Sequence, residues 1–132
     1  MVKKVIIGCV CLVVTILLFL GGKDLYDTAK YKKIISDIVI KTPDISLIPD
    51  GKYNGNFDAV LVSANVEVTV KDHKMIEISI IEHKNDKGES AEVIIDQVIA
   101  KQSLAVDTVS GATNSSKVIL KAIEIALGTK GK

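Results

Sequence analysis

The chain has 132 residues, and 48% of them are hydrophobic. Its mean hydropathy of +0.34 is too high for an ordinary soluble domain of this length. The formal net charge is +1, every basic residue is a lysine, and aromatic residues make up only 4% of the chain. The composition lacks arginine guanidinium groups to bind phosphates and has few aromatic side chains on which bases could stack. It therefore argues against a nucleic-acid partner. The length leaves room for one small folded domain.

The excess of apolar residues lies at the N-terminus, where Val5 to Leu20 contains no charge. With Gly21 and Gly22 the run reaches about 18 residues, or about 27 Å as a helix, which is close to the thickness of a bilayer core. A cleaved signal peptide is the alternative, but no small-residue cleavage site follows the run. Because Lys3 and Lys4 precede it, the positive-inside rule predicts a cytoplasmic N-terminus. We therefore expect a single-pass protein of the cell membrane whose remaining residues are extracytoplasmic.

Both cysteines, Cys9 and Cys11, lie inside this apolar run. The rest of the chain therefore has no thiol for a disulfide, a cysteine-ligated zinc site or a cysteine nucleophile. A lipid-modified Cys9 is not favoured, because the apolar stretch before it is short and continues long after it. We predict no metal site.

The sequence divides into four parts: a membrane anchor at 1–22, a stalk or linker at 23–48, a folded domain at 49–128 and a tail at 129–132. Apolar residues of the stalk are spaced to line one side of a helix, but a mobile spacer is equally compatible with the composition. Pro43 and Pro49 predict an extended link before the domain, because proline disfavours helix at its own position and at the residue before it.

Two strands are predicted in the first half of the domain. Asp50 to Gly55 is rich in turn residues and is predicted to open the domain as a turn. From Val60 to Lys71 apolar residues occupy every second position, which is typical of a half-buried strand. The same alternation resumes from Met75 to Ile81 after a break at Asp72 to Lys74. The two runs predict a β-hairpin.

After a polar loop at Lys84 to Gly88 the apolar period changes to that of a helix, beginning near Ser90. A last helix is predicted from Ser115 to Leu127, with Gly128 as a left-handed cap beyond its end. Strands followed by helices indicate an α+β class. We therefore expect an antiparallel β-hairpin or sheet packed with helices and preceded by a single N-terminal transmembrane helix.

The segment between the two predicted helices, from Gln102 to Ser116, carries the densest cluster of hydroxyl groups in the chain. Free amides and the positive dipole end of the last helix, together with hydroxyls of Thr113, Ser115 and Ser116, predict an anion site, most naturally for a phosphate. Gly111 would let the backbone bend sharply. The simpler alternative is a helix start capped by Asn114 or Ser115.

Familiar catalytic patterns do not occur in this segment. The residues at fixed offsets from Gly111 do not match a phosphate-binding P-loop. No G-x-S-x-G elbow occurs, and nothing in the sequence pairs either histidine with a serine. We predict no catalytic residue.

The ten residues from Asp107 to Ser116 resemble the flavinylation motif of the FMN-binding domain family, which includes flavin subunits of Rnf- and Nqr-type redox complexes and small extracytoplasmic flavoproteins. In that family a separate flavin transferase moves FMN from FAD onto the threonine of an S/T-G-A-T core through a phosphoester bond. The resemblance implies attachment at Thr113 and recognition of Asp107 and Gly111 by the transferase. The remaining cofactor-binding positions that it implies are Ser110, Ala112, Ser115 and Ser116.

The resemblance extends over most of the predicted domain, with Asp50 to Gly55 similar to the family's opening, Val66 to Ile81 to its hairpin and Val118 to Leu127 to its closing helix. His73 replaces the glycine usual in the hairpin turn, which requires a histidine in a left-handed conformation. The loop at Lys84 to Ser90 lacks the Thr-Pro-Gly sequence that approaches the flavin in many relatives. His83 is interpreted as an exposed strand end, with a flavin contact as the alternative.

These expectations describe a membrane-anchored electron carrier or redox subunit rather than a stand-alone catalyst. Its partners would be the flavin transferase and a membrane electron donor or quinone-linked redox complex. Two alternatives remain open: a non-redox interaction or sensing module of the same fold, and a protein that binds FMN reversibly.

Overall fold

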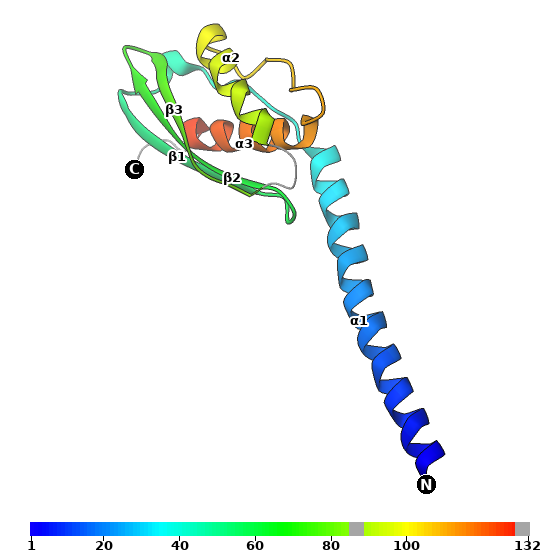
Figure 1. Cartoon of the computed structure of the whole chain (residues 1–132). Helices are drawn as coiled ribbons and strands as arrows, with labels where there is room; N and C mark the ends of the chain where they lie inside the picture. The colour runs from blue at the N-terminus through cyan, green and yellow to red at the C-terminus, as the bar shows by residue number, and fades with distance from the viewer. Residues whose placement is uncertain (85–88, 129–132) are drawn as a thin grey trace.

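The computed structural model describes residues 1–84 and 89–128, and Figure 1 shows a long N-terminal helix leading into an α+β body. The predicted class is confirmed. The helices and strands are α1 (Val2–Asp37), β1 (Gly51–Asp58), β2 (Ser63–Lys71), β3 (Lys74–Lys84), α2 (Ile94–Lys101) and α3 (Thr113–Gly128), with 3₁₀ turns at Ile45–Leu47 and Glu89–Val93.

Helix α1 is continuous over 36 residues, or about 54 Å at 1.5 Å per residue. Its most apolar 18-residue window has a mean hydropathy of 2.9 and none of that window is buried, so it is long and apolar enough to cross a membrane once. The predicted stalk is therefore a helix up to Asp37 rather than a spacer. Ile35 is only 6% exposed, and Tyr31, Ile34 and Ile38 pack against the core, so the last turns of α1 belong to the folded body.

The link between α1 and β1 is extended at its start and then forms one 3₁₀ turn that the sequence did not predict. The side-chain oxygen Oδ1 of Asp44 accepts a hydrogen bond from the amide of Ser46 at 3.0 Å, which initiates the turn. Ile45 and Ile48 are buried on either side of it. The apolar residues between the two prolines thus anchor the link to the domain.

The sheet has three antiparallel strands in the order β1-β2-β3. The prediction of a turn at Asp50 to Gly55 was wrong, because Gly51 to Asp58 pairs with β2 along its whole length. Gly55 faces α3 so closely that a Cβ atom there would lie 2.0 Å from the carbonyl oxygen of Ala122. On the outer face Lys52 donates to Glu67 at 2.8 Å, and this hydrogen bond raises the pKa of the Lys52 ammonium.

The predicted hairpin of β2 and β3 is confirmed, with a two-residue turn. Asp72 has φ +50° and His73 has φ +60°, and left-handed values at both positions are typical of a type I′ turn. Strand β2 starts at Ser63 rather than Val60, because Val60 has φ +75° and lies in the preceding turn. Strand β3 runs three residues beyond the predicted end at Ile81 and finishes at Lys84.

The remaining elements cover the inner face of the sheet. Helix α2 begins after a 3₁₀ turn, so the predicted start near Ser90 corresponds to that turn. Helix α3 includes Gly128 as its last residue, and this glycine does not have the left-handed φ predicted for it. Of the predicted polar loop at Lys84 to Gly88, residues 85–88 lie outside the described residues, as does the tail at 129–132.

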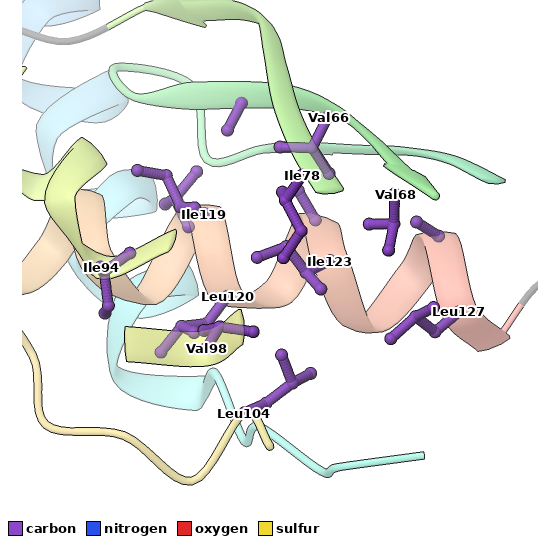
Figure 2. Close-up of a cluster of buried hydrophobic side chains, with 14 of the residues drawn as sticks. Val66, Val68, Ile78, Ile94, Val98, Leu104, Ile119, Leu120, Ile123 and Leu127 are labelled. Carbon is purple, nitrogen blue, oxygen red and sulfur yellow. The ribbon is translucent and has the colours of Figure 1, made fainter. Parts of the chain in front are cut away.

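The core lies between the sheet, α3 and α2. Figure 2 shows α3 between the sheet on one side and α2 with Leu104 on the other. The side chains that meet there are Val66, Val68 and Ile78 from the sheet, Ile94 and Val98 from α2, Leu104, and Ile119, Leu120, Ile123 and Leu127 from α3. Helix α3 thus contributes side chains to both sides of this core, and the candidate site lies at its N-terminus.

Candidate functional site

The hydroxyl-rich segment forms the loop that leads from α2 into α3. From Asp107 to Ser116 the residues differ in burial. Ala112, Ser115 and Ser116 are buried and Val109 is half-buried, whereas the exposed positions are Asp107, Thr108, Ser110, Gly111, Thr113 and Asn114. The exposed residues include Thr113, where the resemblance implies attachment of the flavin. They also include Asp107 and Gly111, which the resemblance assigns to recognition by a transferase.

A tight turn precedes α3. The amide of Ala112 donates to the carbonyl oxygen of Val109 at 3.0 Å, which closes a four-residue turn. Gly111, the third residue of that turn, has φ +79°, a value typical of a type II turn. A Cβ atom at Gly111 would meet nothing within 4 Å, so the positive φ and not crowding favours glycine there.

Ser116 ties this turn to the first turn of α3. Its hydroxyl donates to the carbonyl oxygen of Ala112 at 2.8 Å and accepts a hydrogen bond from the amide of Val109 at 3.0 Å. The amide of Ser116 also donates to Ala112, at 2.9 Å, and this is the first hydrogen bond of the helix. Ala112 is therefore the N-cap residue, and neither Asn114 nor Ser115, the caps of the simpler alternative, occupies that position. Ser116 itself lies inside the helix, and its side chain bonds to backbone groups of residues that precede the helix.

The first turn of α3 can receive an anion. Because the helical ladder begins with the amide of Ser116, the amides of Thr113, Asn114 and Ser115 have no acceptor within the helix. The positive end of the helix dipole lies at the same place. Thr113 presents an exposed hydroxyl beside these amides. A phosphate group bound through that oxygen therefore fits the donors present.

One further residue belongs to this face and was missed by sequence reasoning. Lys117 follows Thr113 by four residues and is half-buried, so the two residues lie on the same face of α3. The four-residue spacing is the signal that would have identified it. Ser115 is 5% exposed and the Ser116 hydroxyl is bonded within the turn, and the phosphate contacts of both residues stay predictions.

The prediction that His83 is an exposed strand end was wrong. Its side chain is 2% exposed, and its Nδ1 lies 3.0 Å from Oε1 of Glu92. The cause is tertiary: the 3₁₀ turn Glu89–Val93 packs beside the end of β3 and supplies the carboxylate. Among residues 1–84 and 89–128, no group of three or more histidine, cysteine, aspartate or glutamate side chains could hold a metal ion.

Comparison with known families identifies this fold and loop. A family model described as an FMN-binding domain matches residues 63–128, which is half of the chain and runs from β2 to the end of α3. The chain belongs to the FMN-binding domain family. The match contains the whole loop and Thr113, whereas β1 precedes it although it is paired with β2. No significant match was found among curated proteins or among solved structures.

Membership of the FMN-binding domain family makes the chain a flavin-binding protein and confirms the resemblance drawn from the motif. The exposed threonine, the free amides and the positive φ of Gly111 lie within the matched region. The donors at the start of α3 thus suit the phosphate of FMN.

We expect Ser116→Ala to destabilise the protein by about 1–3 kcal/mol, because the partly buried amide of Val109 would lose its acceptor. Chemical denaturation of the flavin-free protein, followed by circular dichroism, measures this difference. Ser110→Ala is the matched control, since Ser110 is exposed in the same loop and its replacement should change stability by no more than about 0.5 kcal/mol. Equal stabilities for the two variants would contradict the bracing role of Ser116.

Proposed function

We propose that this protein is a membrane-anchored electron carrier whose FMN is attached covalently to Thr113 by a separate flavin transferase. The observation that carries the proposal is the exposed Thr113 hydroxyl at the start of α3, within the sequence Ser110-Gly111-Ala112-Thr113 of an FMN-binding domain. Because the loop around Thr113 is exposed, another enzyme could reach this residue in the folded domain.

The attachment step balances with FAD as the donor. The oxygen of Thr113 bonds to the FMN-side phosphorus of FAD, the phosphoanhydride bond breaks, AMP leaves, and the hydroxyl proton passes to a base of the transferase. Nothing is oxidised or reduced. This chain contributes the oxygen, and the free amides of the first turn of α3 stabilise the negative charge of the phosphodiester that results. Asp107 and Gly111, both exposed, are the positions that we expect the transferase to contact.

Bound FMN supplies the redox chemistry, while the protein supplies position and electrostatics. Helix α1 supports the proposed setting at the membrane, because its apolar part precedes a helical stalk from Lys23 to Asp37 that is about 22 Å long. With Lys3 and Lys4 on the cytoplasmic side, the domain would face outward. The partners would be a membrane electron donor or a quinone-linked redox complex.

The intact mass of the full chain, purified from membranes of cells that also produce a flavin transferase, tests this proposal. We expect the mass of the uncleaved chain plus one FMN residue. An unmodified chain purified from cells with an active transferase would contradict covalent attachment. It would favour the alternative function, a non-redox interaction or sensing module. Flavin that copurifies but separates on denaturation would indicate reversible binding, and a chain shortened after Leu20 would contradict the anchor.

A further inference from the structure

The upper end of α1 is an integral part of the folded body. The side chain of Ile35 is only 6% exposed, and Tyr31, Ile34 and Ile38 pack against the same core. These residues occupy positions i, i+3, i+4 and i+7, so one face of the helix is held over two turns. In Figure 1 α1 runs without a break from the N-terminus to this contact. The stalk is therefore fixed where it meets the domain.

A charged clamp on α3, formed by Lys121 and Glu124, holds the link that follows α1. The ammonium of Lys121 donates to the carbonyl oxygen of Val39 at 3.1 Å and to Oε1 of Glu124 at 2.9 Å. Oε2 of Glu124 accepts from the amide of Lys41 at 3.0 Å. The two charged side chains are only 25% and 19% exposed, so salt screens these bonds less than it does at an open surface. The clamp thus attaches two backbone groups of the link to α3.

The link is also bound to the loop that carries the candidate site. Oγ1 of Thr42 accepts a hydrogen bond from the amide of Leu104 at 3.1 Å, and Leu104 itself is 1% exposed. Ile45 and Ile48 are buried farther along the link. A pocket of about 460 Å³ lies between the end of α1, the start of the link, the end of β1 and α3, next to the clamp. Residues 31–48 are thus attached to the domain at several points along their length.

Two adjacent glycines, Gly21 and Gly22, form the weakest part of α1. Glycine is less favourable than alanine inside a helix because it loses more backbone freedom on folding. A Cβ atom at either position would meet nothing within 4 Å, so no contact among the described residues requires glycine there. The pair lies between the apolar run and Lys23, the first charge after it, where water reaches the backbone of a membrane helix. Such pairs are among the few positions at which helices kink.

The segments on either side of the glycine pair resist bending. Between Lys23 and Asp37 the sequence has neither glycine nor proline. Because its upper turns are held by the domain, this stalk extends an existing helix and avoids the cost of nucleation. Inside the bilayer the backbone hydrogen bonds must also stay intact, since no water replaces a lost bond there. Bending is therefore favoured at the glycine pair.

We propose that the stalk and the folded domain form one rigid body, which pivots on the membrane at Gly21 and Gly22. The inference depends on the insertion of α1 into a membrane, which is part of the proposed function, and on no property of the flavin. The stalk, about 22 Å long, sets the radius of the movement. Helix α3 contacts α1, and in Figure 1 its start lies beside the upper end of α1. The site at Thr113 therefore keeps its distance from the pivot and changes only its direction.

Distances between pairs of spin labels, measured by pulsed electron paramagnetic resonance on the full chain in lipid nanodiscs, test this inference. Cys9→Ala and Cys11→Ala remove the native thiols. Val5→Cys with Lys30→Cys spans the pivot, at about 37 Å along a straight helix. Lys30→Cys with Lys71→Cys joins the stalk to the exposed end of β2. We expect a broad distance distribution for the first pair and a narrow one for the second.

Replacement of both glycines by alanine, Gly21→Ala with Gly22→Ala, should narrow the distribution of the pair that spans the pivot and leave the second pair unchanged. Gly8→Ala is the matched control, because Gly8 has equally open space in the same helix but lies inside the apolar run. A narrow distribution with the glycines in place, or equal narrowing by Gly8→Ala, would overturn the pivot. A second pair as broad as the first would overturn the rigid body.

The clamp is tested with the second pair of labels. Lys121→Met keeps the aliphatic part of the side chain but removes the charge that binds Val39 and Glu124, so the distribution should broaden. Lys52→Met is the matched control, since Lys52 pairs with Glu67 on the outer face of the sheet. Equal widths for these two variants would overturn the role of the clamp.

These measurements need no flavin, which separates the inference from the proposed attachment. A chain that pivots but never acquires FMN would contradict the proposed function alone. A labelled chain that did not sediment with membranes would contradict the anchor and overturn the pivot with it.

Discussion

Thr113→Ala is expected to abolish covalent flavin while leaving the domain folded. Thr113 supplies the only atom that would bond to the FMN phosphorus, so the loss should be complete rather than partial. Thr113 is exposed at the first position of α3 and is not one of the buried residues that form the core. The folding free energy should therefore change by no more than about 0.5 kcal/mol. Flavin fluorescence in a denaturing gel, with the chain produced beside an active transferase, measures the label.

Two matched variants make this result specific. Thr108→Ala removes an exposed threonine hydroxyl from the same loop and should retain the flavin. Thr113→Ser keeps a hydroxyl at the start of α3 and should restore part of the label. Full labelling of Thr113→Ala would move the attachment to another residue and contradict the proposed site.

Gly55→Ala is expected to cause a larger loss of stability than Gly→Ala at any other glycine in the described part of the chain. A Cβ atom at Gly55 would lie 2.0 Å from the carbonyl oxygen of Ala122 and 2.5 Å from the amide nitrogen of Ala126. Both are backbone atoms of a helix buried on two sides, so neither can rotate away. Overpacking costs about 1–3 kcal/mol or more, and we expect at least about 3 kcal/mol here.

Thermal unfolding of the full chain in mild detergent, followed by circular dichroism, tests this expectation. A loss of that size would lower the melting temperature by roughly 12–24 °C for a domain of this length. Gly111→Ala is the control for a glycine without crowding, since only its φ of +79° opposes a side chain and the cost should be about 1 kcal/mol. If the Gly55→Ala variant had the same melting temperature as the unmodified protein, α3 would have to lie farther from β1 than the structure places it.

The hairpin and the helices were predictable because their signals are local. The alternation through Val66, Val68 and Val70 reflects one face turned to the core, and all three are buried. Strand β1 was missed because Lys52, Asn54 and Gly55 do not alternate in hydropathy. It is a strand because its backbone groups pair with β2 and because Gly55 admits α3, and both conditions involve residues distant in the sequence.

The candidate site divides in the same way. The sequence by itself determined that a cluster of hydroxyls precedes a helix, that Gly111 permits a positive φ, and that an apolar segment can cross a membrane, since residue type and spacing suffice for each. Tertiary structure alone decided which hydroxyls face solvent: Ser116 turns back to brace the loop, while Thr113 stays exposed. It also buried His83 and brought the end of α1 to a pocket beside α3. Burial and long-range hydrogen bonds depend on how separate segments pack, and no local pattern encodes that packing.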